Sequence, residues 1–207
     1  MSESDGPRRA LLVDWTGVMT TSVFAAFASF CEREGLAPEA LATTLRTNPE
    51  CERLVVDLES GTIGDAEFEP RLAAIMSVEP DRLIDRLFAG YTDDAAMHAA
   101  VARARARGVP TGLISNSWGT HRYDRRLLGR LFDGVVLSGE AGVRKPDPRI
   151  YELGAAAVGV PPQRCVFVDD LRPNLPPAAE LGMATIRHRD SDTTIPELEE
   201  LLGVTLR

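Results

Sequence analysis

Four short blocks, each at the end of an expected strand, hold the residues of this chain that can do chemistry. In chain order they are Asp14, then Ser115 with Asn116, then Lys145, then Asp169 with Asp170. They supply a carboxylate nucleophile, a hydroxyl with an amide, a cation and an acidic pair. This set suits the transfer of a phosphoryl group to an aspartate.

The acidic pair is the most specific of these blocks. Asp169 and Asp170 follow the apolar run 166–168, which is typical of a buried strand. Adjacent like charges cost energy unless a cation or a proton relieves them. Mg²⁺ prefers oxygen ligands and usually takes one or two carboxylates, so the pair predicts a magnesium site. Asn174 follows one turn into the next expected helix, where its amide would hold Lys145 or one of the acids.

The other three blocks indicate a phosphoryl-transfer site only when they are taken together. Asp14 is the expected nucleophile, and Gly17 lets the chain turn sharply away from the strand. Ser115 and Asn116 offer a hydroxyl, an amide and backbone N–H groups to phosphate oxygens. Lys145 would neutralise charge on Asp14 and on the phosphoryl group. Taken singly, such residues are just as typical of turns or of solvated surface.

The apolar runs that carry these residues alternate with helical patterns. This alternation predicts an α/β fold with a parallel sheet that is covered on both faces. In such sheets ligands bind outside the carboxyl ends of the strands, where Asp14, Ser115 and Asp169 are expected. The expected strands are Arg9–Asp14, Val109–Ser115, Val135–Ser138, Cys165–Asp169 and Met183–His188, and the expected helices are Asp94–Arg107, His121–Gly129, Pro148–Val158 and Pro173–Leu181.

Residues 20–90 interrupt the alternation with one helical pattern after another. The expected helices are Ser22–Glu34, Pro38–Arg46, Glu50–Leu58, Ala66–Met76 and Pro80–Phe88, with Asp65 as the N-cap of the fourth. A helical insertion directly after the first strand would sit above the active site, where a lid excludes water and selects substrates. We therefore expect a core of residues 9–19 and 91–207 and a helical cap of residues 20–90.

The composition of the 207-residue chain narrows the classes of function. A net charge of −8 argues against non-specific binding to nucleic acid. No apolar run is long enough to span a bilayer, and the first ten residues lack the apolar centre of a signal peptide. Cys31, Cys51 and Cys165 show no metal or redox spacing and are expected to be reduced, packed thiols. We expect a cytoplasmic protein that acts on a small phosphorylated metabolite, with no nucleic-acid or membrane partner and an oligomeric state left open.

From Leu11 to about Leu202 the chain resembles the haloacid dehalogenase-like hydrolase superfamily. Its final third is similar to the subfamily IA branch whose last motif is an acidic pair, and residues 166–175 are similar to the N-terminal phosphatase domains of soluble epoxide hydrolases. The resemblance implies a Rossmann-like parallel sheet core with an inserted helical cap, a Mg²⁺ cofactor and an aspartyl-phosphate mechanism. It makes Asp14 the nucleophile and a metal ligand, Ser115 a phosphate ligand, Lys145 a charge stabiliser, Asp170 with Asp169 metal ligands, and the backbone carbonyl of Thr16 a further metal ligand.

The side chain of Thr16 departs from the pattern of phosphatases in this superfamily. They carry an Asp there, which protonates the leaving oxygen and later activates water. A threonine does no acid–base work near neutral pH, and loss of a general acid costs roughly 10²–10⁴ in rate. The P-type ATPases also have Thr at this place, and their leaving group is a good one. We therefore expect Thr16 to narrow the substrates or to slow hydrolysis of the intermediate, with Asp57 or Glu59 as candidate replacement acids.

Three functions fit the sequence. The first is a Mg²⁺-dependent phosphatase or phosphotransferase, which is the prediction made here. The second is a metal-independent 2-haloacid dehalogenase, in which a carboxylate displaces halide from carbon; such enzymes lack the acidic pair, so Asp169 and Asp170 count against it. The third is a catalytically weak or inactive binding or regulatory protein, which Thr16 favours and the four intact blocks oppose. A metal requirement would separate the first two.

Overall fold

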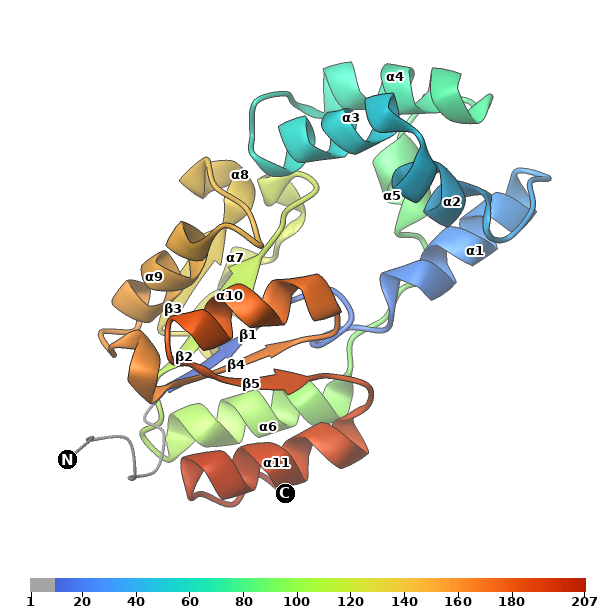
Figure 1. Ribbon diagram of the computed structural model, residues 1–207. Helices are drawn as coiled ribbons and strands as arrows, with labels where there is room; N and C mark the ends of the chain where they lie inside the picture. The colour runs from blue at the N-terminus through green and yellow to red at the C-terminus, as the bar shows by residue number, and fades with distance from the viewer. Residues whose placement is uncertain (1–9) are drawn as a thin grey trace.

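A five-stranded parallel sheet runs through the centre of the protein, whose computed structural model describes residues 10–207 (Figure 1). The strand order is β3-β2-β1-β4-β5. The strands are β1 (Ala10–Val13), β2 (Thr111–Ser115), β3 (Gly134–Leu137), β4 (Cys165–Asp169) and β5 (Ala184–Arg187). The predicted α/β class and parallel sheet are confirmed, and each strand lies within two residues of its predicted bounds. Arg9, the expected first residue of the first strand, lies outside the described residues.

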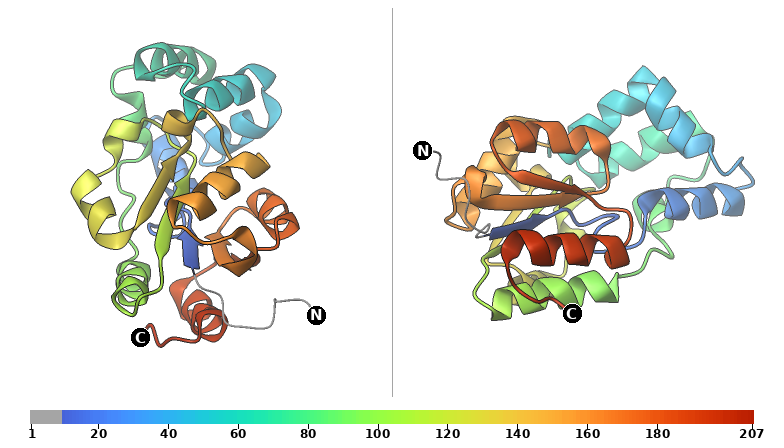
Figure 2. Two further views of the ribbon diagram at one scale, coloured as in Figure 1. Left: turned by 90° about the vertical axis from the view of Figure 1, so that its left-hand side faces the viewer. Right: turned by 60° about the horizontal axis from the view of Figure 1, so that its bottom comes forward.

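Helices cover both faces of this sheet. On one face lie α9 (Pro148–Ala157) and α10 (Leu175–Glu180), and on the other lie α6 (Ala95–Ala106) and α11 (Ser191–Leu202). The right-hand view of Figure 2 shows α6 and α11 side by side on their face. Shorter elements lie in the connections: η1 (Thr120–Arg122), α7 (Arg125–Leu131), α8 (Ser138–Ala141), η2 (Pro162–Arg164) and η3 (Arg172–Asn174).

The alternation of side chains along β1 explains why both faces need a cover. Leu11 and Val13 point into the apolar core beneath α6 and α11, while Ala10 and Leu12 point into the core beneath α9. All four are completely buried. Successive side chains of a strand point to opposite faces, so a strand buried on both faces is a continuous apolar run that ends only where the strand leaves the sheet.

Helix α11 is absent from the sequence-based prediction. Its segment carries Thr193, Thr194 and an internal Pro196, all poor helix formers. Ile195, Leu198 and Leu202 nevertheless recur at helical spacing and are buried against the sheet. Their packing outweighs the weak local propensity, as is usual for helices in folded proteins.

Two further predictions need correction at helix ends. Gly64 is the N-cap of α4 and Asp65 is its first helical residue, so Asp65 does not cap the helix. The carboxylate of Asp65 instead accepts a hydrogen bond from Arg122 at 2.6 Å. The predicted helix 121–129 is divided into η1 and α7, because the side chain of Asp124 starts a new helix by accepting from the backbone N–H groups of residues 126 and 127.

Five helices form a separate layer above the carboxyl ends of the strands (Figures 1 and 2). They are α1 (Val23–Arg33), α2 (Ala40–Thr47), α3 (Pro49–Glu59), α4 (Asp65–Met76) and α5 (Leu83–Leu87). We call residues 23–88 the helical block. It encloses an apolar core of its own, which includes Phe30, Leu41, Leu54 and Phe68.

The two segments that join the helical block to the sheet run side by side. Thr20 and Asp93 form an antiparallel bridge, and the backbone N–H of Thr21 donates to the carbonyl of Thr92 at 2.8 Å. All three cysteines of the chain are buried, as the sequence predicts. Within residues 10–207, none of the helices combines the length and the apolar composition that a bilayer crossing requires.

Candidate active site

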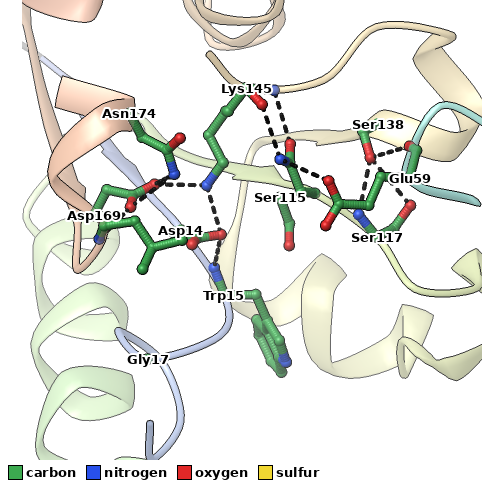
Figure 3. A network of polar contacts seen from close by, with 12 residues as sticks. Asp14, Trp15, Gly17, Glu59, Ser115, Ser117, Ser138, Lys145, Asp169 and Asn174 are labelled. Carbon is green, nitrogen blue, oxygen red and sulfur yellow. Dashed lines mark hydrogen bonds and ion pairs between the residues drawn. The ribbon is translucent and has the colours of Figure 1, made fainter. Parts of the chain in front are cut away.

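Asp14, Lys145 and Asp169 meet at the carboxyl ends of β1 and β4 (Figure 3). The Nζ atom of Lys145 lies 2.8 Å from Oδ1 of Asp14 and 2.6 Å from Oδ2 of Asp169. In the sheet Val13 is the partner of Val168, so Asp14, directly after β1, lies beside Asp169, the last residue of β4. Burial lowers the pKa of Lys145, but the two carboxylates outweigh burial and hold that pKa above its usual value. The ammonium is therefore charged and compensated by two acids.

Lys145 is the only lysine among the 23 Lys and Arg residues of the chain. Its side chain is 1% exposed, which is unusual for a charged residue. An ammonium is a compact point charge, whereas a guanidinium is a wide planar fork. A chain that otherwise uses arginine thus has its one lysine where a small cation must lie between two carboxylates. This count is a signal in the sequence that the spacing of motifs does not capture.

Asp169 is held firmly by its neighbours. The side-chain amide of Asn174 lies 3.0 Å from each of its two carboxylate oxygens, and the backbone N–H of Leu171 donates to its Oδ1 at 2.8 Å. With Lys145 on Oδ2, both oxygens of Asp169 already have hydrogen-bonding partners. Of the two roles that the sequence offers Asn174, the structure shows the one in which it holds an acid.

Asp170 differs from Asp169 in having an oxygen without a partner. Its Oδ1 is buried and has no hydrogen bond among the described residues. Gly17 approaches the same carboxylate closely, with φ of +81°, and a Cβ at Gly17 would lie only 2.4 Å from Oδ2 of Asp170. The loop after β1 therefore needs glycine both for its backbone conformation and for this contact.

The three carboxylates form a group that fits a divalent cation. Asp14, Asp169 and Asp170 each offer one oxygen, and these oxygens lie within 4.8 Å of one another. Burial raises the pKa of Asp14 to about 7, although Lys145 opposes the rise. Burial and the nearby charge of Asp169 raise the pKa of Asp170 to about 6. Raised pKa values and an unpartnered buried oxygen are the features that a bound Mg²⁺ would relieve.

Ser115 is the last residue of β2, which lies next to β1 in the sheet, and Asn116 follows it. The hydroxyl of Ser115 is buried and lies 2.9 Å from the hydroxyl of Tyr123, a neighbour that the sequence patterns do not indicate. The side-chain oxygen of Asn116 accepts from the backbone N–H of Lys145 at 2.8 Å, and its amide donates to the backbone carbonyl of Lys145 at 3.0 Å. Asn116 thus fixes the backbone from which Lys145 projects.

Glu59, the last residue of α3, extends from the helical block into this network (Figure 3). Its Oε1 accepts from the indole N–H of Trp118 at 2.9 Å. Its Oε2 accepts from Nε of Arg144 at 2.6 Å and from the amide of Asn116 at 3.2 Å. The backbone carbonyl of Glu59 also accepts from the hydroxyl of Ser138 at 2.5 Å. One residue of the helical block is therefore tied to four residues of the core.

A cavity of about 580 Å³ lies between these side chains and the helical block. Asp14, Thr16, Lys145 and Asp170 line its polar end. Of the two acids that the sequence puts forward as replacements for an acid at position 16, Glu59 lines this cavity and Asp57 is not among the described lining residues. A second, wider depression of about 840 Å³ also borders Asp170, but Asp14 and Lys145 are not among its lining residues.

Residues 8–182 match the sequence model of the haloacid dehalogenase-like hydrolases. The chain belongs to this family. The predicted membership is thereby confirmed, and with it the assignment of the protein as a hydrolase.

Relatives and solved structures of the same family agree with this assignment. This hydrolase is 36% identical over 117 residues to bifunctional epoxide hydrolase 2 of Sus scrofa, a match that covers 53% of this chain and 21% of that protein. It is 30% identical over 113 residues to the sesquiterpene phosphatase astK of Aspergillus oryzae, and this match covers 53% of this chain and 58% of that protein. The chain therefore matches only part of either relative. Its fold is shared with a HAD family enzyme of Bacteroides thetaiotaomicron solved as a magnesium complex, with a TM-score of 0.70, 19% identity and coverage of 89% and 94% of the two chains.

Proposed function

We propose that this hydrolase is a Mg²⁺-dependent phosphatase or phosphotransferase that acts on a small phosphorylated metabolite through Asp14. The observation that carries the proposal is the buried ammonium of Lys145 between Asp14 and Asp169, beside the unpartnered oxygen of Asp170. A buried cation and buried carboxylates in contact favour binding of a dianionic phosphate together with a divalent metal. A matched relative that is named as a phosphatase supports the same reaction.

In this proposal the carboxylate of Asp14 is the nucleophile. It would attack phosphorus, the bond from phosphorus to the ester oxygen would break, and the leaving oxygen would keep the electron pair and take a proton from solvent. Lys145 would balance charge on Asp14 and on the phosphoryl group throughout. Attack of water on the same phosphorus would then release inorganic phosphate and restore the carboxylate. In a phosphotransferase an acceptor hydroxyl would take the place of water.

Asp14, Asp169 and Asp170 are the side chains that would hold Mg²⁺, with the backbone carbonyl of Thr16 as a fourth protein ligand. When bound, Mg²⁺ supplies positive charge that favours the ionised carboxylates and attracts phosphate oxygens. Asp170 is the most available of the three side chains, because both oxygens of Asp169 already have partners. Asn174 would keep Asp169 oriented, and Ser115 and Asn116 would contact the phosphate.

In this proposal the helical block is a cap. We assign residues 20–90 to this cap and residues 9–19 and 91–207 to the catalytic core. A cap that closes over Asp14 excludes water and shapes the space for the organic part of the substrate. Thr16 lines that space and offers no acid, so substrates whose leaving oxygen needs little protonation should react best.

The test is a phosphatase assay on aryl, acyl and alkyl phosphates with and without Mg²⁺, for wild type and Asp14→Asn. We expect phosphate release that requires Mg²⁺ and is lost in Asp14→Asn, because an amide is a poor nucleophile and a weaker metal ligand. Wild-type turnover in Asp14→Asn would refute a covalent route through Asp14. Halide release from 2-haloacids without metal would favour the dehalogenase instead.

The second candidate is a binding or regulatory protein of the same family, which the side chain of Thr16 favours. Calorimetry separates it from the enzyme. Both candidates predict Mg²⁺ binding that Asp170→Ala abolishes and that Asp81→Ala, in an exposed loop, retains. Magnesium binding with no turnover of any phosphate, in wild type and in Thr16→Asp alike, would decide for the binding protein.

A further inference from the structure

The cavity above Asp14 has walls of two different kinds. Its volume of about 580 Å³ falls within the roughly 300–1,000 Å³ that is usual for small-molecule sites. The charged and polar side chains described above form one end. The opposite walls come from α1, α2 and α3 of the helical block, which Figure 1 shows above and to the right of the strands. Six apolar side chains of these helices carry the argument: Val23, Phe27, Ala42, Leu45, Val55 and Val56.

These six side chains also border the core of the helical block: Phe27 is part of that core, and Val23, Leu45 and Val55 pack against it, but all except Phe27 remain only half-buried. On α3, Leu54 and Leu58 are buried in that core, while the adjacent Val55 and Val56 are only half-buried and face the cavity. The same division holds on α2, where Leu41 is completely buried and Ala42 is half-buried. A helix that turns a second apolar face toward open space has surface to offer to an apolar ligand.

The charged residues of the helical block leave this apolar region clear. Arg46 and Glu52 border the cavity, and both are exposed to solvent. Glu59 is buried, but its carboxylate oxygens already accept hydrogen bonds from Trp118, Arg144 and Asn116. A sugar, a nucleoside or an amino acid would need hydrogen-bonding partners for its own polar groups, because polar groups buried without partners are costly.

We infer that the substrate is a phosphate monoester whose organic part is apolar, with its phosphate at Asp14 and its hydrocarbon between α1, α2 and α3. This inference rests on the proposed function and narrows its substrate class. The polar end of the cavity binds the charged head, and the helical block recognises the tail by burying it. Affinity should therefore grow with the length of the tail until the space between the three helices is full.

The experiment uses 4-alkylphenyl phosphates from methyl to hexyl, in the presence of Mg²⁺. Along this series the acidity of the leaving phenol hardly changes. The length of the tail therefore varies while the intrinsic rate of the chemical step stays nearly constant. In wild type we expect kcat/KM to rise up to roughly fourfold for each methylene that is buried. Glycerol phosphate and sugar phosphates should be poor substrates.

Two glutamate substitutions form a matched pair for this series. Ala42→Glu places a carboxylate on the apolar wall and should flatten the dependence on tail length. Ala74→Glu makes the same change at an exposed position of α4 that does not line the cavity, and it should keep the wild-type dependence. If Ala42→Glu does not fold, Ala42→Phe replaces it, since a larger apolar side chain should shorten the tail length at which the rise stops.

Binding of alkylphosphonates, which the enzyme cannot hydrolyse, separates this inference from the proposed function. Affinity measured by calorimetry with Mg²⁺ should rise with tail length in the same way. Turnover of aryl phosphates with no dependence on tail length, or with preference for sugar phosphates, would overturn the inference and leave the proposed function intact. If no phosphate is turned over, the proposed function fails, and the phosphonate affinities alone decide: a rise with tail length supports the apolar site and equal affinities overturn it.

Discussion

The carboxylate of Glu59 lies 2.6 Å from Nε of Arg144, the residue that precedes Lys145. This ion pair joins the end of α3 to the core at the edge of the proposed substrate cavity. The side chain of Asn116 connects this ion pair to Lys145. Its amide donates to Glu59, and its two hydrogen bonds to Lys145 involve the backbone N–H and the backbone carbonyl of that lysine. The side chain of Asn116 therefore links the helical block to the backbone of Lys145.

Glu59→Gln tests whether Glu59 positions the site or replaces the missing acid. Three N–H groups donate to its carboxylate, so both carboxylate oxygens already have hydrogen-bonding partners. We therefore expect Glu59→Gln to weaken the ion pair and to lower turnover of aryl and alkyl phosphates by the same factor. Steady-state kinetics on the two substrate types gives the ratio. A selective loss of alkyl phosphate turnover would instead identify Glu59 as the general acid.

Substitutions of Lys145 test the buried charge cluster. Removal of one partner from a buried ion pair usually costs about 3–5 kcal/mol, and Lys145→Met leaves two buried carboxylates uncompensated. The metal-free variant should unfold at lower urea concentration than wild type. Mg²⁺ should raise its midpoint more than that of wild type, because binding to the more negative cluster stabilises the folded state.

Lys145→Arg is the control that keeps the charge. The side chain at this position is 1% exposed, so the wider guanidinium must displace Asp14 or Asp169 to fit. We expect phosphatase activity to fall in Lys145→Arg although positive charge is retained. Full activity in that variant would mean that charge alone matters at this position.

The folding stability of the metal-free protein should depend on pH through Asp170. Its pKa in the folded protein is about 6, raised from 3.8 by burial and by the charge of Asp169. Between these values the folded state binds more protons than the unfolded state, so this group makes the free energy of unfolding fall as pH rises from about 4 to about 6. Asp170→Asn removes the titrating group and should gain stability relative to wild type across this window.

Thermal unfolding in a chelator at a series of pH values measures this difference. Asp81→Asn, in an exposed loop, is the control and should follow wild type at every pH. A constant difference between Asp170→Asn and wild type across the window would contradict the prediction. Added Mg²⁺ should remove most of the effect, because the metal favours the ionised carboxylate.

The sequence predicts those site residues that lie at the carboxyl ends of the strands. Asp14 and Asp169 end apolar runs that neighbouring parallel strands bury, and the carboxyl ends of parallel strands lie at one edge of the sheet. The contacts of Glu59 cannot be predicted in this way, because they join distant parts of the chain. Its partners Trp118 and Arg144 are 59 and 85 residues away in the chain, and no local pattern encodes where the end of α3 meets the core.

Long-range packing likewise determines the features that the sequence patterns do not reveal. The pairing of Ser115 with Tyr123 depends on the path of the loop between η1 and α7. Helix α11 depends on the sheet that Ile195 and Leu198 cover, since its own residues are weak helix formers. The apolar wall of the cavity appears only when α1, α2 and α3 are brought together above the strands.

Thr16→Asp tests whether the side chain at position 16 limits the reaction. Thr16 is half-buried and lines the cavity beside Asp14, where it has no acid to donate to a leaving oxygen. Wild type should hydrolyse aryl and acyl phosphates much faster than alkyl phosphates, because phenolates and carboxylates are stable anions that leave without protonation. Phosphorylated Asp14 should also persist and be detectable by mass spectrometry after acid quenching, since no acid–base group at position 16 activates water.

In Thr16→Asp, turnover of alkyl phosphates should rise by up to the roughly 10²–10⁴ that a general acid supplies, with little change for aryl phosphates. Thr16→Asn is the matched control, because Asn has nearly the shape of Asp but cannot act as an acid near neutral pH, and this variant should not show the rise. Steady-state kinetics on paired aryl and alkyl phosphates measures both. Equal rates for the two substrate types in wild type would mean that another residue already serves as the acid, and Glu59 is the acidic residue of the helical block that lines the cavity within hydrogen-bonding reach of Asn116.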